Sequence, residues 1–380
     1  MNQPRVKPPT LTYPSVVGPS MFNSSRLTVA RQRAGLTKKE LAQRVGVDPR
    51  AVSGFEAGQY MPTDDNVRRI ARTLGYPVEF FDADDIELLD SDGVSFRSMT
   101  KMTARQRDAA LAAGSLAFVL SDWVDQEFDL PDTDIPDFHG ATPDVAAQSL
   151  RQHWRLGELP IKNMVHLLEA KGVRVFSLAE NFMEVDAYSV WRGMRPFIFL
   201  NTTKSGERRR FDAAHELAHL VMHRHASPNG LEAEKEAQAF AGAFLMPTAS
   251  LKALGRVTPN LSYIMSLKKK WAVSSAAITV RLFEVGHLSY YHYNRLYVEL
   301  SKKGYRSNEP HGIKPETSQV WQKVFAQLRR EGLGVQSLAD RLLLPIEEIV
   351  KLVFGLVTIN LPTNDIGGSP TRGGHLTVIK

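Results

Sequence analysis

Residues 210–223 form the most informative stretch of this sequence, Arg210-Phe-Asp-Ala-Ala-His-Glu-Leu-Ala-His-Leu-Val-Met-His223. Apolar residues surround His215, Glu216 and His219 on almost every side of the helix that this spacing predicts. A helix that is apolar all round is buried, and buried polar side chains need partners. We therefore predict a buried helix that carries a functional site.

The two histidines predict a metal site. His215 and His219 are four residues apart, so both imidazoles leave the same face of a helix, one turn apart. Two ring nitrogens at this spacing can reach one tetrahedral zinc ion. Glu216 follows directly, where a carboxylate can take a proton from a water that zinc activates. A chance pairing of two histidines on a surface helix is the alternative, and the apolar flanks argue against it.

The composition limits which ligands and compartments are available. The chain has 380 residues, enough for two or three domains, and no cysteine, so a metal needs histidine and carboxylate ligands. No apolar run approaches the ~18 residues of a membrane span. The polar, proline-rich N-terminus lacks the apolar segment of a signal peptide, so we expect the cytoplasm. The net charge of +6 permits a nucleic-acid partner without requiring one.

A third metal ligand is required, and the residues leave it open. His225 stands six residues after His219, but Met222 occupies the place where that arrangement needs a glycine, so we discount it. The run from Leu231 to Ala241 is strongly helical. Glu234 and Glu236 border opposite edges of its apolar face, and periodicity does not choose between them.

The N-terminal part has the pattern of several short helices, with Thr37 and Asp48 at helix starts. Residues 36–58 and Pro62 resemble the helix-turn-helix of phage-repressor-like (XRE, Cro/C1-type) proteins. The resemblance implies that the helix from Pro49 enters the major groove of double-stranded DNA. The implied DNA-binding residues are Arg50, Ser53 and Gly54 at base edges, Lys38, Lys39 and Arg44 near phosphates, and Pro49 at the start of the helix. A helical protein-interaction module on the same scaffold is the alternative.

The central part resembles a known family. The stretch 210–223 and the run Glu234-Lys-Glu-Ala-Gln-Ala-Phe-Ala-Gly-Ala-Phe-Leu-Met-Pro247 are similar to the two motifs of the ImmA/IrrE metallopeptidases. Ala218 and Gln238 depart from the usual glycine and asparagine, and neither change removes a ligand. The resemblance implies Zn²⁺ bound by His215, His219 and Glu234, with Glu216 as the catalytic base. Tyr188, Arg210, His223 and His225 are candidate donors for the oxyanion, and a structural role is the alternative for each.

The predicted fold class is α+β, mostly α. We expect a long helix over residues 103–128, and strands over 172–178, 185–192 and 196–201. The predicted domains are a flexible arm (1–22), a five-helix helix-turn-helix domain (23–82), an acidic, solvated linker (83–102), a zincin-like domain with a small sheet and the HExxH helix (103–285), a helical C-terminal domain (286–360) and a tail (361–380). Residues 338–349 repeat the spacing of residues 41–52, with Glu347 and Glu348 where DNA contact would need neutral or basic groups. This echo indicates a packing or partner-binding module.

The resemblance implies a regulatory zinc endopeptidase fused to its own DNA-binding domain. Such a protein cleaves a repressor or antitoxin in stress, mobile-element or phage-defence responses. The alternative is a transcriptional regulator, or a toxin–antitoxin component, whose zinc domain senses or scaffolds without proteolysis. Glu216 favours the enzyme, because a zinc scaffold does not need it. The expected partners are double-stranded DNA, a protein substrate and a second copy of the chain, since one helix-turn-helix makes few base contacts; no membrane is expected.

Overall fold

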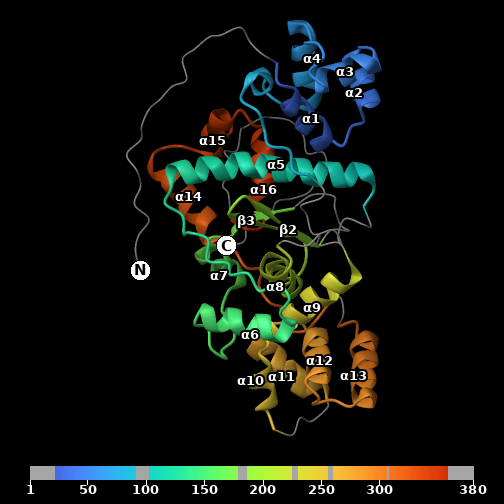
Figure 1. Ribbon diagram of the computed structural model, residues 1–380, viewed down its shortest axis with the longest axis vertical. Coiled ribbons are helices and arrows are strands. Elements are labelled where there is room, and N and C mark those ends of the chain that lie inside the picture. The colour runs from blue at the N-terminus through green and yellow to red at the C-terminus, as the bar shows by residue number, and fades with distance from the viewer. Residues whose placement is uncertain are drawn as a thin grey trace, which may run out of the picture.

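The computed structural model of the chain describes residues 22–90, 102–178, 186–224, 230–255, 260–305 and 308–357. These residues are mostly helical and form one three-stranded sheet, which confirms the predicted α+β, mostly α class. The N-terminal helices lie at one end of the molecule, and the long helix α5 (Ala104–Glu127) crosses its middle (Figure 1). The predicted arm and tail lie outside the described residues, except Phe22, which stacks on Phe81.

The N-terminal unit has the five predicted helices. They are α1 (Ser24–Arg33), α2 (Lys38–Val45), α3 (Pro49–Glu56), α4 (Asp64–Leu74) and the 3₁₀ helix η1 (Val78–Asp82). The side chains of Thr37 and Asp48 cap α2 and α3, as predicted. Gly46 ends α2 with a φ of 76°, a conformation that favours glycine, and so permits the tight turn into α3.

Part of the predicted acidic linker contacts α1 and α5. Ile86 is buried, and its backbone N–H donates to Ser25 Oγ of α1 at 3.1 Å. The N–H of Leu89 donates to Ser115 Oγ of α5 at 2.9 Å. Residues 83–90 therefore contact both the helix-turn-helix unit and α5, while their acidic side chains are exposed, and residues 91–101 lie outside the described ranges.

The sheet has the strand order β1-β3-β2, with β1 (Arg174–Ser177), β2 (Ala187–Arg192) and β3 (Arg195–Leu200). β1 pairs with β3 in parallel, and β2 and β3 form an antiparallel hairpin. The three predicted strands are thus confirmed, each within two or three residues. Residues 187–190 of β2 are all buried, so both faces of the hairpin are covered.

Helices cover the two faces of the sheet. On one face α5 packs against the aromatic residues of the hairpin, with ring centroids of Phe118 and Phe197 4.8 Å apart. Tyr188 points to this face and donates its hydroxyl hydrogen to the backbone oxygen of Ala110 at 3.1 Å. A Cβ at Gly114 would lie 2.9 Å from the Tyr188 hydroxyl, so glycine allows this close approach. The other face of the hairpin packs on α8 (Gly206–Met222), the predicted HExxH helix.

The remaining helices of the central part surround α8. Helix α9 lies between α8 and α6, and α11, α12 and α13 form the end of the molecule opposite the helix-turn-helix unit (Figure 1). Their bounds are α6 (Pro143–His153), α7 (Met164–Ala170), α9 (Leu231–Leu245), α10 (Thr248–Lys252), α11 (Leu261–Trp271), α12 (Ser275–Glu284) and α13 (Tyr290–Lys302). None of the described helices is long and apolar enough to cross a membrane.

The helices of the predicted C-terminal domain, residues 286–360, pack in two places. Helix α13 packs on α12 and α11, whereas α14 (Gln319–Arg330), α15 (Val335–Leu342) and α16 (Ile346–Val353) return to α7, β1 and α5. The reason is a set of buried contacts with the sheet: Trp321 packs on Phe176 at 5.4 Å between centroids and donates to the Val175 oxygen. Residues 338–349, the echo, thus lie in helices that pack on the rest of the molecule. The domain boundaries stay predictions.

Candidate metal centre and nucleic-acid interface

Helix α8 places the HExxH residues in the interior. It begins after Ser205, whose hydroxyl caps the helix by accepting a hydrogen bond from the Arg208 N–H. Almost every residue of the helix is buried, as predicted, because the sheet and α9 cover it from two sides. His219 and Glu216 are buried, while His215 is partly exposed. His215 therefore gives the cluster its contact with solvent.

His215, His219 and Glu234 come together between α8 and α9. One ligand atom from each lies within 4.8 Å of the others. The Nε2 atoms of His215 and His219 are 3.2 Å apart, and Glu234 places Oε2 3.3 Å from the first and Oε1 3.4 Å from the second. Ligands about 2.0–2.1 Å from a tetrahedral zinc ion lie roughly 3.3 Å from one another. The three side chains therefore fit such an ion.

The charges of the cluster suit a cation. Burial would raise the pKa of Glu234, but the neighbouring His215 and His219 lower it to about 2, so the carboxylate is charged. Burial lowers the pKa of His219, which favours its neutral form. A charged carboxylate and neutral imidazoles are the states in which these groups bind a metal.

Glu216 lies one residue from His215 and faces the sheet. Its Oε2 accepts a hydrogen bond of 2.7 Å from the hydroxyl of Ser189 in β2. Burial raises the pKa of Glu216 well above its usual range, and the nearby carboxylates of Glu234, Asp212 and Asp186 act in the same direction. The carboxyl group therefore holds a proton more readily than a carboxyl in water. Sequence reasoning missed Ser189, because both faces of its strand are buried and no alternation marks it.

Glu236, the alternative third ligand, has a different partner. Its Oε2 lies 2.9 Å from Nε2 of His223, whose Nδ1 is 3.0 Å from Nδ1 of His219. Glu234, and not Glu236, thus lies beside both histidines of the motif. His223 continues the four-residue spacing of His215 and His219, so the sequence held a signal for this contact.

The expected oxyanion donors are engaged elsewhere. Tyr188 faces α5, as described above, so it points away from α8. Arg210 binds Glu316 and the Ile161 backbone oxygen, and is therefore structural. His223 contacts His219 and Glu236, and His225 lies outside the described residues. The predictions for Tyr188 and Arg210 are wrong, because their polar atoms serve the packing of the fold.

A cleft of about 570 Å³ opens beside the cluster. Phe211, one turn before His215, and Gln238, one turn after Glu234, line it together with residues of α12, α13 and the segment 308–315. The cleft is large enough for several residues of an extended polypeptide and lies one helical turn from the histidines and Glu234.

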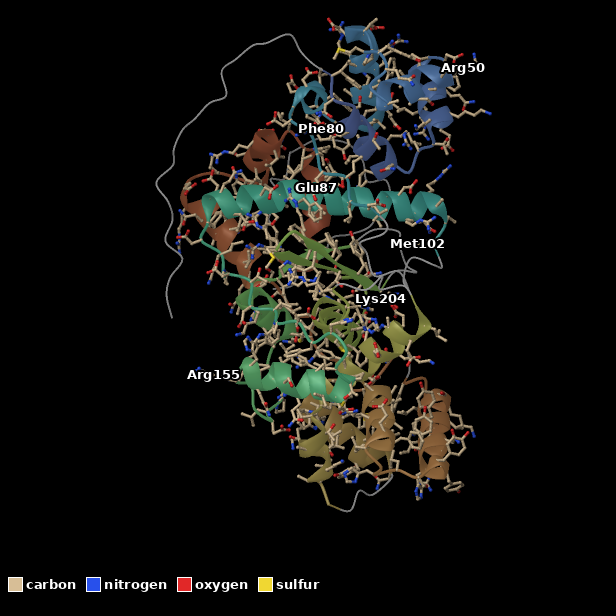
Figure 2. All side chains as sticks on the ribbon, in the orientation of Figure 1. Arg50, Phe80, Glu87, Met102, Arg155 and Lys204 are labelled. Atoms are coloured by element: carbon tan, nitrogen blue, oxygen red, sulfur yellow. The ribbon has the colours of Figure 1, made fainter. Side chains whose placement is uncertain are left out.

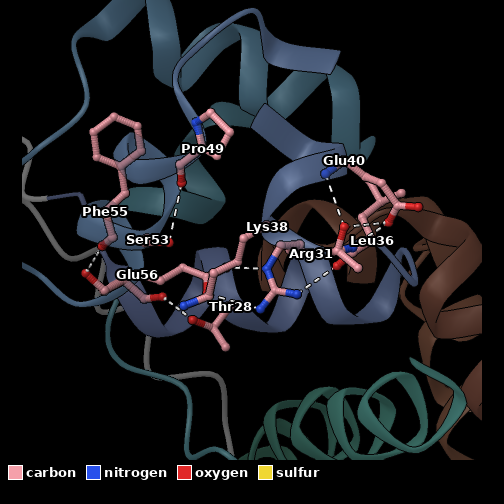
Figure 3. A network of polar contacts seen from close by, with 11 residues as sticks. Thr28, Arg31, Leu36, Lys38, Glu40, Pro49, Ser53, Phe55 and Glu56 are labelled. Atoms are coloured by element: carbon pink, nitrogen blue, oxygen red, sulfur yellow. Dashed lines mark hydrogen bonds and ion pairs between the residues drawn. The ribbon is translucent and has the colours of Figure 1, made fainter. Parts of the chain in front are cut away.

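The predicted DNA contacts lie on α2 and α3. Six of the seven are exposed: Lys38, Lys39, Arg44, Pro49, Arg50 and Ser53. Arg50 lies at the outer edge of the molecule (Figure 2). Lys38 forms an ion pair of 3.3 Å with Glu56, which also binds Arg31 (Figure 3). Glu56 thus ties the start of α2 to α1.

Gly54 departs from the prediction, because it is buried and cannot face a base edge. A Cβ at this position would lie 2.2 Å from Cζ of Tyr60. The Tyr60 ring covers the glycine and donates its hydroxyl hydrogen to the Arg50 backbone oxygen at 2.9 Å. Tyr60 is itself exposed, so at this place the surface presents the Tyr60 side chain and not Gly54.

Two family models match the chain. The model described as a helix-turn-helix matches residues 29–81, and the peptidase M78 model, described as an IrrE N-terminal-like domain, matches residues 168–283. An uncharacterized HTH-type transcriptional regulator from Methanothermobacter thermautotrophicus is 43% identical over 63 residues, which are 17% of this chain and 86% of that protein. The peptidase M78 match spans β1 to α12 and therefore includes His215, His219 and Glu234. The chain therefore belongs to the helix-turn-helix family in residues 29–81 and to the IrrE-like peptidase M78 family in residues 168–283.

Proposed function

We propose that the chain is a regulatory zinc endopeptidase joined to a DNA-binding domain, and that it cleaves a repressor or antitoxin protein. The observation that carries the proposal is Glu216, a buried carboxyl next to a cluster that fits zinc. A site that only held a metal would need His215, His219 and Glu234 alone. The peptidase M78 match and the neighbouring cleft support hydrolysis of a polypeptide.

The residues present divide the chemistry between them. His215, His219 and Glu234 would hold zinc, which polarises a scissile carbonyl and lowers the pKa of water when it is bound. Ser189 donates to Oε2 of Glu216 and so orients the carboxyl that would take a proton from the attacking water. Glu216 would then return that proton to the leaving amine.

The helix-turn-helix unit supplies a second activity. The relative that matches residues of this unit is named as a transcriptional regulator, and the exposed basic residues of α2 and α3 suit a phosphate backbone. We infer that the unit binds double-stranded DNA, in a homodimer if the operator is an inverted repeat. The competing function is a regulator whose zinc domain senses or scaffolds.

Co-expression separates the two functions. The full chain and its Glu216→Gln variant are each expressed with the proteins encoded by neighbouring genes, and fragments are identified by mass spectrometry. We expect a fragment with the wild type and none with Glu216→Gln, while both bind equal amounts of zinc. If no fragment depends on Glu216 and both proteins still bind DNA, the peptidase proposal fails and the regulator remains.

A further inference from the structure

Three side chains form a line that leads away from the metal cluster. Nδ1 of His219 lies 3.0 Å from Nδ1 of His223, and Nε2 of His223 lies 2.9 Å from Oε2 of Glu236. His219 and His223 come from α8 and its C-terminal end, whereas Glu236 comes from α9. The Nε2 atom of His219, on the opposite side of its ring, faces His215 and Glu234.

The hydrogen-bonding capacity of these groups fixes where the protons are. A carboxylate only accepts, so Nε2 of His223 must carry a hydrogen and donate it to Glu236. A neutral imidazole that carries its hydrogen on Nε2 has a lone pair on Nδ1. The facing Nδ1 of His219 must then carry a hydrogen. Its Nε2 is left with the lone pair.

We propose that His223 and Glu236 are positioning residues that hold His219 in its metal-binding tautomer. The inference rests on the proposed metal site and adds to it two residues that touch neither metal nor substrate. Without an acceptor at His219 Nδ1, the hydrogen can move to Nε2, where it blocks the lone pair. Removal of such an outer partner typically lowers metal affinity about 10–100-fold.

The burial of the line supports a specific role. The His223 side chain is 7% exposed, whereas that of Glu236 is 38% exposed. An exposed ion pair contributes little by itself. The imidazole of His223 is nearly buried, and each of its ring nitrogens contacts a partner, His219 on one side and Glu236 on the other. These two contacts fix the orientation of the ring.

Two substitutions at position 223 test the proposal with matched chemistry. In His223→Asn the side-chain amide reaches the place of Nδ1 and offers an oxygen to His219, but not the place of Nε2. In His223→Gln the longer amide reaches towards Glu236 instead. Zinc affinity of the full chain is measured by competition with a chelator, so no substrate is needed. We expect His223→Gln to lose about 10–100-fold in affinity and His223→Asn to stay within about threefold of the wild type.

A second pair of variants tests the carboxylate. Glu236→Ala should weaken zinc binding by about tenfold. Glu232→Ala, one turn earlier on α9, should leave it unchanged, because Glu232 is exposed and pairs with Lys235. Equal affinities for His223→Asn and His223→Gln, whether normal or weakened, overturn the inference while leaving the proposed function standing. A wild-type chain that binds no zinc overturns both.

A spectroscopic measurement covers the case in which the variants do not fold. Nitrogen-15 NMR of the zinc-loaded wild-type chain, labelled at its histidines, distinguishes the two neutral tautomers. His223→Asn identifies the signals of His223 by their loss. We expect His223 to carry its hydrogen on Nε2, which leaves its Nδ1 to accept from His219. A hydrogen on Nδ1 of His223 contradicts the proposal.

Discussion

Arg33 in α1 and Glu348 in α16 form a buried ion pair, with 2.5 Å between Nε and Oε2, although 315 residues separate them in the chain. Lys351 also contacts this carboxylate, at 3.0 Å. The pair joins the helix-turn-helix unit to the C-terminal helices that pack on the sheet and α5. The ion pair therefore holds the helix-turn-helix unit against the part of the chain that carries the His215, His219 and Glu234 cluster.

Loss of this ion pair should destabilise the chain. Glu348→Ala leaves Arg33 buried without its carboxylate, and we expect the free energy of unfolding to fall by about 3 kcal/mol. Glu347→Ala is the matched control, since that neighbouring residue is exposed, and it should change stability by less than about 0.5 kcal/mol. Urea unfolding measures both. Equal effects of the two substitutions would show that the ion pair does not stabilise the junction.

The Gly54 position should tolerate alanine only when Tyr60 is absent. In the wild type the added Cβ displaces the Tyr60 ring, which loses its hydrogen bond to the Arg50 oxygen and its edge contact with Phe55. We expect a loss of about 1 kcal/mol. In a Tyr60→Ala background, Gly54→Ala should be neutral or stabilising, because alanine favours a helix over glycine by about 1 kcal/mol. The same loss in both backgrounds would refute the packing explanation.

Phosphate contacts by α2 should appear in the salt dependence of DNA binding. We expect Lys39→Ala and Arg44→Ala each to lower the slope of log K against log salt by about 0.9 on a random-sequence duplex. Lys269→Ala, an exposed lysine of α11, serves as the control and should leave the slope unchanged. Fluorescence anisotropy at several salt concentrations gives the slopes. If all three variants have the slope of the wild type, Lys39 and Arg44 of α2 do not contact DNA phosphates.

Asp212 should make stability depend on pH. Burial, together with Asp186, raises the pKa of Asp212 to about 7 in the folded chain, against the partial effect of Arg208. Because the folded state then binds the proton more tightly than the unfolded state, this contribution is full below about pH 4 and is lost as the pH rises to about 7. Asp212→Asn should therefore gain about 3 kcal/mol in stability relative to the wild type between about pH 5 and about pH 8.

The control for this prediction is Asp64→Asn, an exposed residue in the first turn of α4. Its stability difference from the wild type should stay constant over the same range. Urea unfolding at several pH values provides the measurement. A pH-independent difference for Asp212→Asn would show that its carboxyl is already ionised in the folded chain at low pH.

The most accurate predictions from the sequence rest on local patterns. The strands, α5 and α8 follow from apolar runs, and the Thr37 and Asp48 caps follow from the residue types that prefer them. The spacing of His215 and His219 predicted a shared face. Glu234 could be told from Glu236 only by the resemblance, because helical periodicity placed both at an edge of the apolar face. The structure separates them by their partners, His219 and His223.

Contacts between residues far apart in the chain could not be predicted from the sequence. Tyr188 and Arg210 are polar residues near the motif, but contacts with α5 and with Glu316 direct them elsewhere. The return of α14–α16 to the sheet depends on Trp321, whose partners are about 146 residues earlier in the chain. Gly54 is buried by a tyrosine that follows the helix. None of these contacts has a periodic signal in the sequence.

The central claim is that Glu216 serves a peptidase reaction. The most direct measurement compares protein N-termini, across the whole proteome, between cells that produce the wild type and cells that produce Glu216→Gln from the native locus. Zinc content and DNA binding of the two purified proteins are measured alongside and should be equal. The account predicts at least one new internal N-terminus in a DNA-binding or antitoxin protein that occurs only with the wild type. Identical N-termini under every condition in which the chain is produced would contradict it.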